Sequence, residues 1–246
     1  MDNIVTLDLG VFLLGTFAAA LITGVAGFAF GLVAAAIWLH ALTPIQATAL
    51  IVAYGLLVQG FAVWKLRHNL NAARLIPLII GSAIGVPFGI LLLRWAPPAN
   101  LRIAVGILLI LFSLYNLVRP KLPSLTQAGR AADAAAGFVN GLVGGSTGLA
   151  GIVIVIWSGF RGWQRDEQRA AFQPTGVATF LVTLIALSGV GEITADIMTF
   201  FALGLPALAV GTWAGWKLYG KLDEARFRKI VLVLLLVSGV ALAVMP

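Results

Sequence analysis

Two stretches of the sequence place several glycines inside otherwise apolar runs, and a hydroxyl or amide side chain, Thr23 or Asn140, directly precedes each. The first, GVAGFAFGLVA, covers residues 24–34, and the second, GLVGGSTGLAG, covers residues 141–151, with glycines at the first, fourth and eighth places of both. Glycine weakens a helix by about 1 kcal/mol relative to alanine. A helix that begins at such a break presents unpaired N–H groups and the positive end of its dipole. The pattern therefore predicts binding of an anion by main-chain amides and neutral side chains.

The candidate binding residues are glycines and neutral side chains in these stretches and in the apolar run that follows each. In the first half they are Thr23, Gly24, Gly27, Phe28, Gly31, Gln46, Thr48 and Tyr54. In the second half they are Asn140, Gly144, Gly145, Ser146, Thr147, Gly148, Gln173, Pro174 and Thr175. We expect the half-helices to begin at residues 27–31 and 144–148. We expect Ser146 and Thr147 to donate hydroxyl hydrogen bonds to the anion, and Pro174 to kink its helix toward the centre.

A second interpretation of the same residues is purely structural. Glycines four residues apart, such as Gly137 and Gly141, are the ordinary means of close helix packing in lipid, and amide side chains join neighbouring helices there. Asn140 and Gln173 fit this interpretation as well as the first. Arg161 is a candidate charge in a cytoplasmic vestibule, although a role in setting membrane orientation explains it too. The sequence leaves these alternatives open.

The elements that carry these residues are those of a polytopic membrane protein. Of the 246 residues, 61% are hydrophobic and only 10% are charged, which is more apolar surface than a soluble core of this length can bury. Eight uncharged runs recur along the chain, at residues 9–39, 45–64, 75–93, 103–118, 134–160, 170–191, 197–216 and 230–246. The chain contains no cysteine and only two histidines, far apart in sequence, so we expect no metal and no cofactor. The first residues lack the basic region of a signal peptide, and we expect them to be retained.

The first and fifth runs are too long for one crossing. A straight helix over residues 9–39 would be roughly 46 Å long, against a hydrocarbon core of about 30 Å. We therefore expect each run to fold back at its glycines as a re-entrant or half-helix hairpin. With these hairpins, fourteen lysines and arginines fall on one side and only Arg94 and Arg102 on the other, as the positive-inside rule requires.

Matched positions in the two halves predict an internal duplication. Gln46 matches Gln168, Gly81 and Gly85 match Gly211 and Gly215, and Arg102 matches Arg228. Three full crossings per half make this an inverted repeat with both termini outside. The predicted organisation is a first membrane repeat at residues 1–118, a cytoplasmic linker at 119–131 and a second membrane repeat at 132–246. Anionic lipids are expected partners at the basic face.

With these motifs laid out (two GxxGxxxGL stretches, QxxAxxxxxxG-like second runs and GxxxG third runs), the whole chain resembles the TauE/SafE sulfite exporter family, also called the toluenesulfonate uptake permease family. The resemblance implies a bacterial or archaeal inner-membrane transporter for sulfite, sulfonates or related small organic anions. It places the central site on the two glycine stretches and on residues 46–48 and 173–175. Neither glycine stretch is followed by the proline that is typical of the family.

We therefore expect an inverted-repeat transporter, not an enzyme, that binds a small oxyanion near the midplane and works by rocking one set of helices. No ionisable residue lies clearly inside a span, so a co-transported proton would travel on the substrate. A transporter or channel for another small anion, such as a carboxylate, is the first alternative. An intramembrane enzyme is the second, and it would need a histidine, a cysteine or paired carboxylates within the bilayer.

Overall fold

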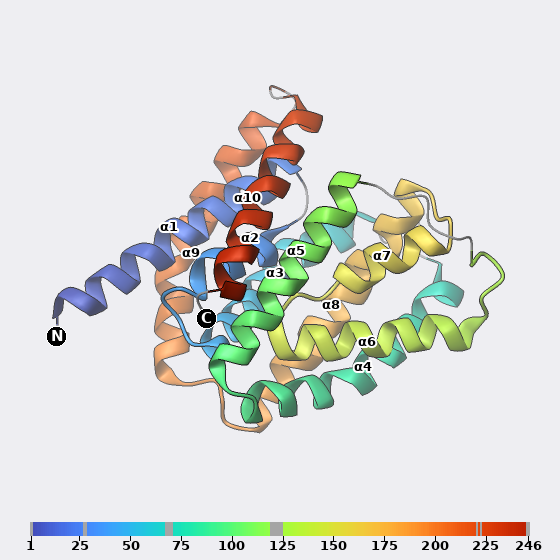
Figure 1. The fold of residues 1–246 in the computed structure, drawn as a ribbon, viewed down its shortest axis with the longest axis horizontal. Helices are drawn as coiled ribbons and strands as arrows, with labels where there is room; N and C mark the ends of the chain where they lie inside the picture. Colours follow the sequence, from blue (N-terminus) through green and yellow to red (C-terminus); the bar gives the residue numbers. More distant parts are fainter. Residues whose placement is uncertain are drawn as a thin grey trace. The chain divides into compact units, whose positions relative to one another are not determined.

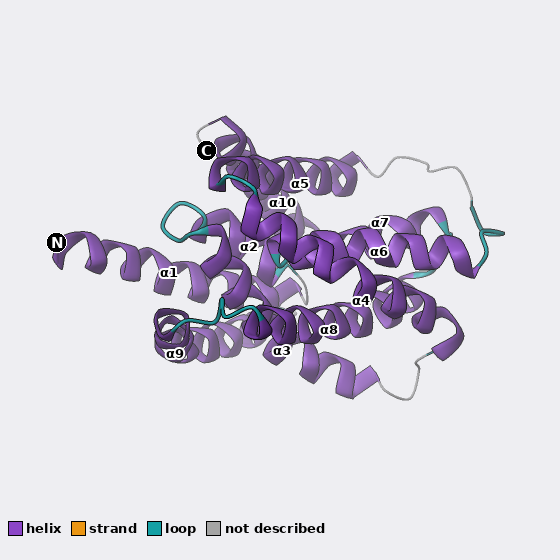
Figure 2. Ribbon diagram, turned by 90° about the horizontal axis from the view of Figure 1, so that it is seen from below, coloured by secondary structure: helices purple, strands orange, loops and turns teal. Residues whose placement is uncertain are grey.

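The computed structural model describes residues 2–26, 29–66, 71–118, 125–219, 221 and 223–244. Every regular element in this part of the chain is a helix (Figures 1 and 2), which confirms the predicted all-helical fold. Five of these helices are long and apolar enough to cross a membrane, and two shorter apolar segments accompany them. The chain is therefore a multi-pass membrane protein.

The helices follow the eight predicted apolar runs, with two of the runs divided. In the first half they are α1 (Asp2–Ala26), α2 (Phe30–Trp38), α3 (Pro44–Leu66), α4 (Ala72–Trp95) and α5 (Pro98–Val118). In the second half they are α6 (Arg130–Thr147), α7 (Ile152–Phe160), α8 (Arg165–Gly189), α9 (Ala195–Leu218) and α10 (Glu224–Val244). The divided runs are the first and the fifth, as predicted from their length.

The two breaks differ in detail from the prediction. Ala29 precedes α2 in the left-handed region, with φ 82°. Gly148 and Gly151 flank the second break, with φ 72° and 104°, a region that glycine enters without steric cost. The expectation that a half-helix begins at residues 144–148 is wrong, because those residues form the last turn of α6 and its cap, and α7 begins at Ile152.

The chain reverses direction at each break. In the first, the indole N–H of Trp38, at the end of α2, donates to the carbonyl of Phe12 in α1 at 3.2 Å. In the second, the indole N–H of Trp157, near the end of α7, donates to Asp133 Oδ1 in the first turn of α6 at 2.8 Å. Each short helix therefore runs back along the long helix that precedes it.

The chain divides into two compact units, and each combines helices from both halves of the sequence. Unit 1 comprises Met1–Ile51, Ala96–Pro120 and Thr194–Pro246. Unit 2 comprises Val52–Trp95 and Lys121–Ile193. Unit 1 thus holds α1, α2, α5, α9 and α10, and unit 2 holds α4, α6, α7, α8 and most of α3.

Glycines hold α4 and α6 together along unit 2. Gly81 lies against the carbonyl of Ala134 and Gly85 against that of Phe138, while Gly141 of α6 lies against the carbonyl of Ser82. In each case an added Cβ would collide with the oxygen. The residue numbers rise together along both helices, so α4 and α6 run parallel (Figure 1).

The corresponding contacts join α9 and α1 in unit 1. A Cβ on Gly211 would lie 2.6 Å from the carbonyl oxygen of Phe17, and one on Gly24 would lie 2.8 Å from that of Thr212. Gly215 lies in the same way against the carbonyl of Leu21. These pairs are the ones that the sequence offsets between the two halves predict. Close helix packing is thus one role of these glycines in both units.

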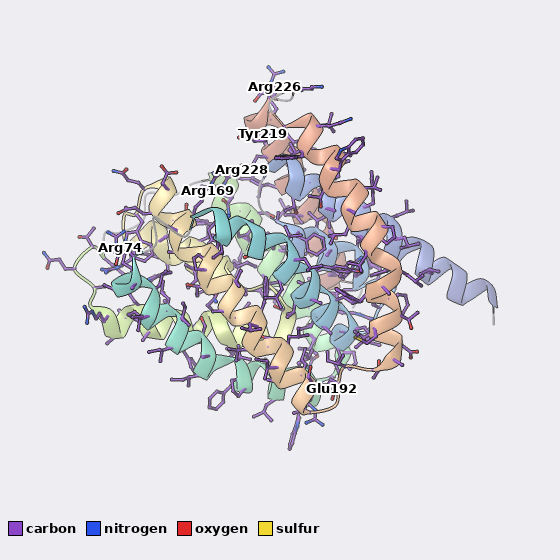
Figure 3. The ribbon with its side chains drawn as sticks, turned by 180° about the vertical axis from the view of Figure 1, so that it is seen from behind. Arg74, Arg169, Glu192, Tyr219, Arg226 and Arg228 are labelled. Atoms are coloured by element: carbon purple, nitrogen blue, oxygen red, sulfur yellow. The ribbon has the colours of Figure 1, made fainter. Side chains whose placement is uncertain are left out.

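In each unit, basic residues at one end are separated from a single arginine at the other end. In unit 2, Arg74 and Arg169 lie at one end, and Glu192, which forms an ion pair with Arg94 at 2.9 Å, lies at the other (Figure 3). In unit 1, Arg228 at the start of α10 donates to Asn116 near the end of α5 at 2.7 Å, so α5 and α10 run antiparallel. Arg102, at the start of α5, consequently lies at the opposite end from Arg228.

Candidate functional site

The break between α6 and α7 is held by Asn140, whose side chain is fully buried. Its Oδ1 accepts the main-chain N–H of Gly151 at 2.8 Å, which orders the residue immediately before α7. Its Nδ2 donates to Ser82 Oγ in α4 and to Thr179 Oγ1 in α8, both at 3.3 Å. Both amide hydrogens of Asn140 are therefore used inside the protein, and the residue joins four elements.

The hydroxyl groups at the end of α6 are also engaged. Ser146 donates to the carbonyl of Leu142 at 2.8 Å, and Thr147 donates to that of Val143 at 2.7 Å. Hydroxyls inside helices commonly bond back in this way. The Thr147 oxygen accepts the N–H of Leu149 at 3.2 Å. Donation from Ser146 and Thr147 to an anion stays a prediction.

One face of α8 packs against this break. Phe172 lies 3.6 Å from the position of a Cβ on Gly151, and the methyl group of Thr179 lies 2.7 Å from that of a Cβ on Gly144. Because residues 172, 175 and 179 fall on the same face of a helix, Thr175 lies between these two contacts. The α8 helix therefore presents Thr175 to the region of the break.

Thr175 is fully buried, and its hydroxyl has no hydrogen-bond partner in the part of the chain that the structure describes. Thr179 and Thr183, one and two turns later, donate to the carbonyls of Thr175 and Thr179 at 2.7 and 2.8 Å. The Thr175 hydroxyl makes no such bond to a helix carbonyl. The preceding residue, Pro174, lies inside α8 and has no N–H to donate. A buried polar group without a partner costs about 1–3 kcal/mol. Such a group beside a helix break is the strongest sign of a ligand in unit 2.

Two glutamine side chains extend the polar interior along α8 and α3. The Gln173 oxygen is buried, and it too lacks a partner among the described residues. The Gln59 oxygen, likewise buried and unpaired within the described residues, lies 2.7 Å from the position of a Cβ on Gly176. Glycine at 176 therefore leaves the space that the Gln59 amide occupies.

The start of α7 adds main-chain donors to this interior. The first intrahelical bond runs from Val155 N–H to the Gly151 carbonyl at 2.9 Å. The amides of residues 152–154 are thus left without helical partners, as in the first turn of any helix. Amides and hydroxyls of this kind can bind an oxyanion. The described residues contain no group of three His, Asp or Glu side chains that could hold a metal ion.

In the first half, the candidates in α1 and α2 are placed as follows. Thr23 donates to the carbonyl of Ala19 at 2.7 Å, and Gly24 packs against α9. Gly31 is the second residue of α2. Gly27 and Phe28 lie outside the described residues. The binding role of all five stays a prediction.

The candidates in α3 differ in character. Gln46 Oε1 accepts the N–H and the hydroxyl of Thr43 at 3.0 and 3.1 Å, and Gln46 N–H donates to the Thr43 oxygen at 3.3 Å. This reciprocal arrangement is a capping box that begins α3. Thr48 and Tyr54 are buried within the same helix. The capping bonds give Gln46 a structural task, and a binding role for these residues stays a prediction.

Arg161 and Asp133 form a buried ion pair where α7 ends beside the start of α6. Arg161 Nε lies 3.3 Å from Asp133 Oδ1, and the two side chains are 14% and 5% exposed. Arg161 also donates to the carbonyls of Leu125 and Thr126 at 3.0 and 2.8 Å. These contacts join the end of α7 to the start of α6. The Arg161 charge is neutralised by Asp133 within the protein.

The sequence matches the model of a known family. The model of the sulfite exporter TauE/SafE family matches residues 11–242, nearly the whole chain. The chain belongs to the TauE/SafE family. No curated protein and no solved structure shows a match. Membership of a sulfite exporter family makes this multi-pass protein a member of a transport family, and it is consistent with the prediction that the protein is not an enzyme.

Within this TauE/SafE chain, sequence reasoning missed the residues that position Asn140. Ser82 and Thr179 were not among the candidates, and neither was Gly151. The spacing of Thr175, Thr179 and Thr183 at four-residue intervals is a readable signal, because it places three hydroxyls on one face of an apolar helix.

Proposed function

We propose that the protein is a secondary transporter that moves a small oxyanion, sulfite or an organosulfonate, across the inner membrane of the cell. Membership of the TauE/SafE family supports the class of function. The buried, unpaired hydroxyl of Thr175 beside the α6–α7 break is the observation that carries the site.

In this proposal the anion binds near the midplane at the glycine breaks. The Thr175 hydroxyl, the NH₂ group of Gln173 and the first amides of α7 supply neutral hydrogen-bond donors in unit 2. Such donors suit an anion that has lost its water, because a charge-assisted hydrogen bond is roughly twice as strong as a neutral one. A proton that accompanies the anion travels on the anion itself.

The proposed topology is an inverted repeat of residues 1–118 and 132–246, joined by a cytoplasmic linker at 119–131. Two pairs of matched helices support it. Gly55 of α3 lies against Phe180 of α8, and Gly176 of α8 lies against Gln59 of α3, so the matched helices α3 and α8 run antiparallel. The matched helices α5 and α10 run antiparallel as well. Antiparallel matched helices are what inversion of one half requires.

The charge distribution supports the orientation. The α6–α7 hairpin begins and ends at the basic end of unit 2, where Asp133 pairs with Arg161. In unit 1, α1 runs parallel to α9, which ends in the basic segment, and α10 starts there. Both termini then lie on the less basic side, which is outside by the positive-inside rule, and anionic lipids meet the basic side.

Uptake into proteoliposomes tests the proposal. The purified protein is reconstituted, and entry of radiolabelled sulfite is followed with taurine, sulfoacetate or acetate as unlabelled competitors. Saturable uptake that sulfonates block and acetate does not block is the expected result. Block by acetate alone would indicate a carboxylate carrier, and no uptake in either gradient direction, with or without a pH gradient, would exclude sulfite as the cargo.

A matched pair of variants tests the site. Thr175→Val removes an unpaired hydroxyl at almost constant volume, so we expect at least a tenfold loss of uptake with little change in thermal stability. Thr183→Val is the control, because its hydroxyl bonds to the helix carbonyl of Thr179. Equal uptake by the two variants would place the anion elsewhere.

A further inference from the structure

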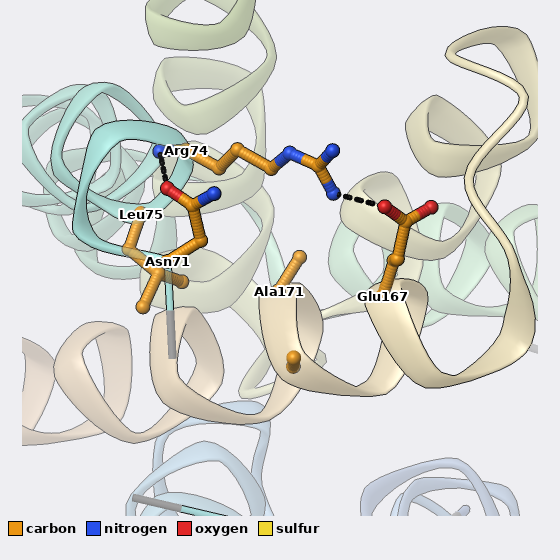
Figure 4. Close-up of a pocket in the computed structure, with 6 residues that line it drawn as sticks. Asn71, Arg74, Leu75, Glu167 and Ala171 are labelled. Atoms are coloured by element: carbon orange, nitrogen blue, oxygen red, sulfur yellow. Dashed lines mark hydrogen bonds and ion pairs between the residues drawn. The ribbon is translucent and has the colours of Figure 1, made fainter. Parts of the chain in front are cut away.

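A second polar feature of unit 2 lies at its basic end, away from the helix break. It is a hollow of about 200 Å³ between the start of α4 and the start of α8 (Figure 4). The residues that line it are Asn71, Arg74, Leu75, Glu167, Ala170 and Ala171. Three of these side chains are small or apolar, so the polar chemistry of the hollow comes from Asn71, Arg74 and Glu167.

Arg74 is held in the hollow by a partly exposed ion pair and by a contact with an aromatic ring. Its Nη1 lies 2.7 Å from Glu167 Oε1, and the two side chains are 39% and 40% exposed. An ion pair that is this exposed contributes about 0–1 kcal/mol. The guanidinium also lies over the ring of Trp163, 5.4 Å from its centroid. Arg74 can therefore exchange the Glu167 carboxylate for another anion at low cost in free energy.

Glu167 has a second attachment that keeps it in place during such an exchange. Its Oε2 accepts the main-chain N–H of Gln164 at 3.0 Å, as part of the capping box that begins α8. The carboxylate therefore stays at the helix start when the guanidinium leaves it.

Asn71 supplies a further donor. Its Oδ1 accepts the N–H of Arg74 at 3.4 Å, which turns the amide nitrogen away from that bond (Figure 4). Asn71 is exposed, so this nitrogen is open to solvent. A guanidinium and an amide N–H₂ together match the oxygen atoms of a sulfite or sulfonate group.

The hollow ends on packed side chains that separate it from Thr175. Ala171 lines the hollow and also belongs to a buried cluster with Leu78 of α4 and Ile154 of α7. Residues 171, 175 and 179 lie on one face of α8. The hollow and the hydroxyls of Thr175 and Thr179 therefore lie in succession along the same face of α8, and the apolar cluster separates them.

We propose that Arg74 and Asn71 form an entry subsite for small oxyanions at the basic end of unit 2, in which Arg74 pairs with Glu167 until an arriving anion replaces Glu167 as the partner of the guanidinium. The subsite deepens the proposed transport function and rests on it for the identity of the anion. The Glu167 carboxylate takes the place on Arg74 that the sulfonate or sulfite oxygen takes on arrival.

Binding to the purified protein in phosphatidylcholine nanodiscs tests the subsite without any need for transport. Methanesulfonate is titrated while tryptophan fluorescence is recorded, because an anion on Arg74 alters the cation that lies over Trp163. The fluorescence change should be absent in Trp163→Phe. We expect Glu167→Gln to bind methanesulfonate about threefold to tenfold more tightly, and Arg74→Gln to bind it at least tenfold more weakly.

The opposite end of the same two helices provides the control. Arg94→Gln and Glu192→Gln alter an ion pair with a similar 2.9 Å separation, and they should leave the fluorescence titration unchanged. Equal affinities in the wild type, Glu167→Gln and Arg74→Gln would overturn the proposal. Loss of the response when phosphatidylglycerol is added to the nanodiscs would also overturn it, because Arg74 would then bind a lipid phosphate.

The transport proposal and the entry-subsite proposal can be disproved independently of each other. Thr175→Val should keep the fluorescence response and lose uptake, because it alters only the interior site. A response to methanesulfonate without sulfite uptake would remove the transport proposal and keep the subsite. Uptake with an unchanged half-saturating concentration in Arg74→Gln would remove the subsite and keep the transport proposal.

Discussion

Gly141 of α6 lies against the main-chain carbonyl of Ser82 in α4, with no room for a Cβ between them. The matched Gly24 of α1 lies in the same way against the carbonyl of Thr212 in α9. The same kind of contact therefore occurs at the matched positions of both glycine stretches, which shows that these glycines serve helix packing. Packing by Gly141 does not exclude a site, because the break that follows it is held by a different set of contacts.

Gly141→Ala should destabilise the protein. The new methyl group has to push α4 and α6 apart, and overpacking of this kind costs about 1–3 kcal/mol. We expect a lower melting temperature in detergent, and a smaller decrease for Gly24→Ala, where the distance is 2.8 Å. Gly189→Ala in α8 is the control, since nothing lies within 4 Å of its Cβ position. Unchanged melting of Gly141→Ala would show that these helices do not pack as described.

Asn140→Ala should reduce stability as well as uptake. The substitution leaves the Gly151 N–H buried without its 2.8 Å acceptor, and such a group costs about 1–3 kcal/mol. Gln173→Ala removes no hydrogen bond, so it should reduce uptake with a smaller change in melting temperature. Melting curves and sulfite uptake measured on both variants check this. A loss of uptake by Asn140→Ala at unchanged melting temperature would make Asn140 a binding residue instead of a connector.

The sequence predicted the helical fold and the two divided runs, because length and composition are local properties. It did not predict where the second break falls. The glycines at 144 and 145 serve packing against α8 and α4, and the turn forms at Gly148 and Gly151, where φ is positive. The sequence alone does not show whether a glycine serves helix packing or forms the turn.

The hydrogen-bond partners of the polar side chains could not be predicted from the sequence either. Asn140 and Gln173 have the same chemistry and similar surroundings in sequence, yet one makes three hydrogen bonds and the other makes none among the described residues. Which of two amides is satisfied depends on helices that are far away in the chain. The role of each amide was therefore not predictable from the sequence.

Asp133→Asn should destabilise the α6–α7 hairpin. Loss of the Asp133 charge leaves Arg161 buried without its counter-ion, which costs about 3–5 kcal/mol when one partner of a buried pair is removed. Asp223→Asn is the control, because its ion pair with Arg226 is largely exposed and contributes about 0–1 kcal/mol. Melting temperatures of the two variants in detergent give the comparison. Equal melting temperatures would mean that the Arg161–Asp133 pair does not stabilise the hairpin.

Cysteine accessibility provides a direct test of the hairpin topology, because the native chain contains no cysteine. Gln127, Asp166 and Val190 are exposed, and they lie before α6, at the start of α8 and just after α8. If α6 and α7 enter and return, Gln127→Cys and Asp166→Cys lie on the inner face, and an impermeant maleimide on intact cells labels only Val190→Cys. If the run over residues 134–160 crossed once, Gln127→Cys and Val190→Cys would react alike and Asp166→Cys would differ. That second pattern would rule out the hairpin, and with it the proposed inverted repeat.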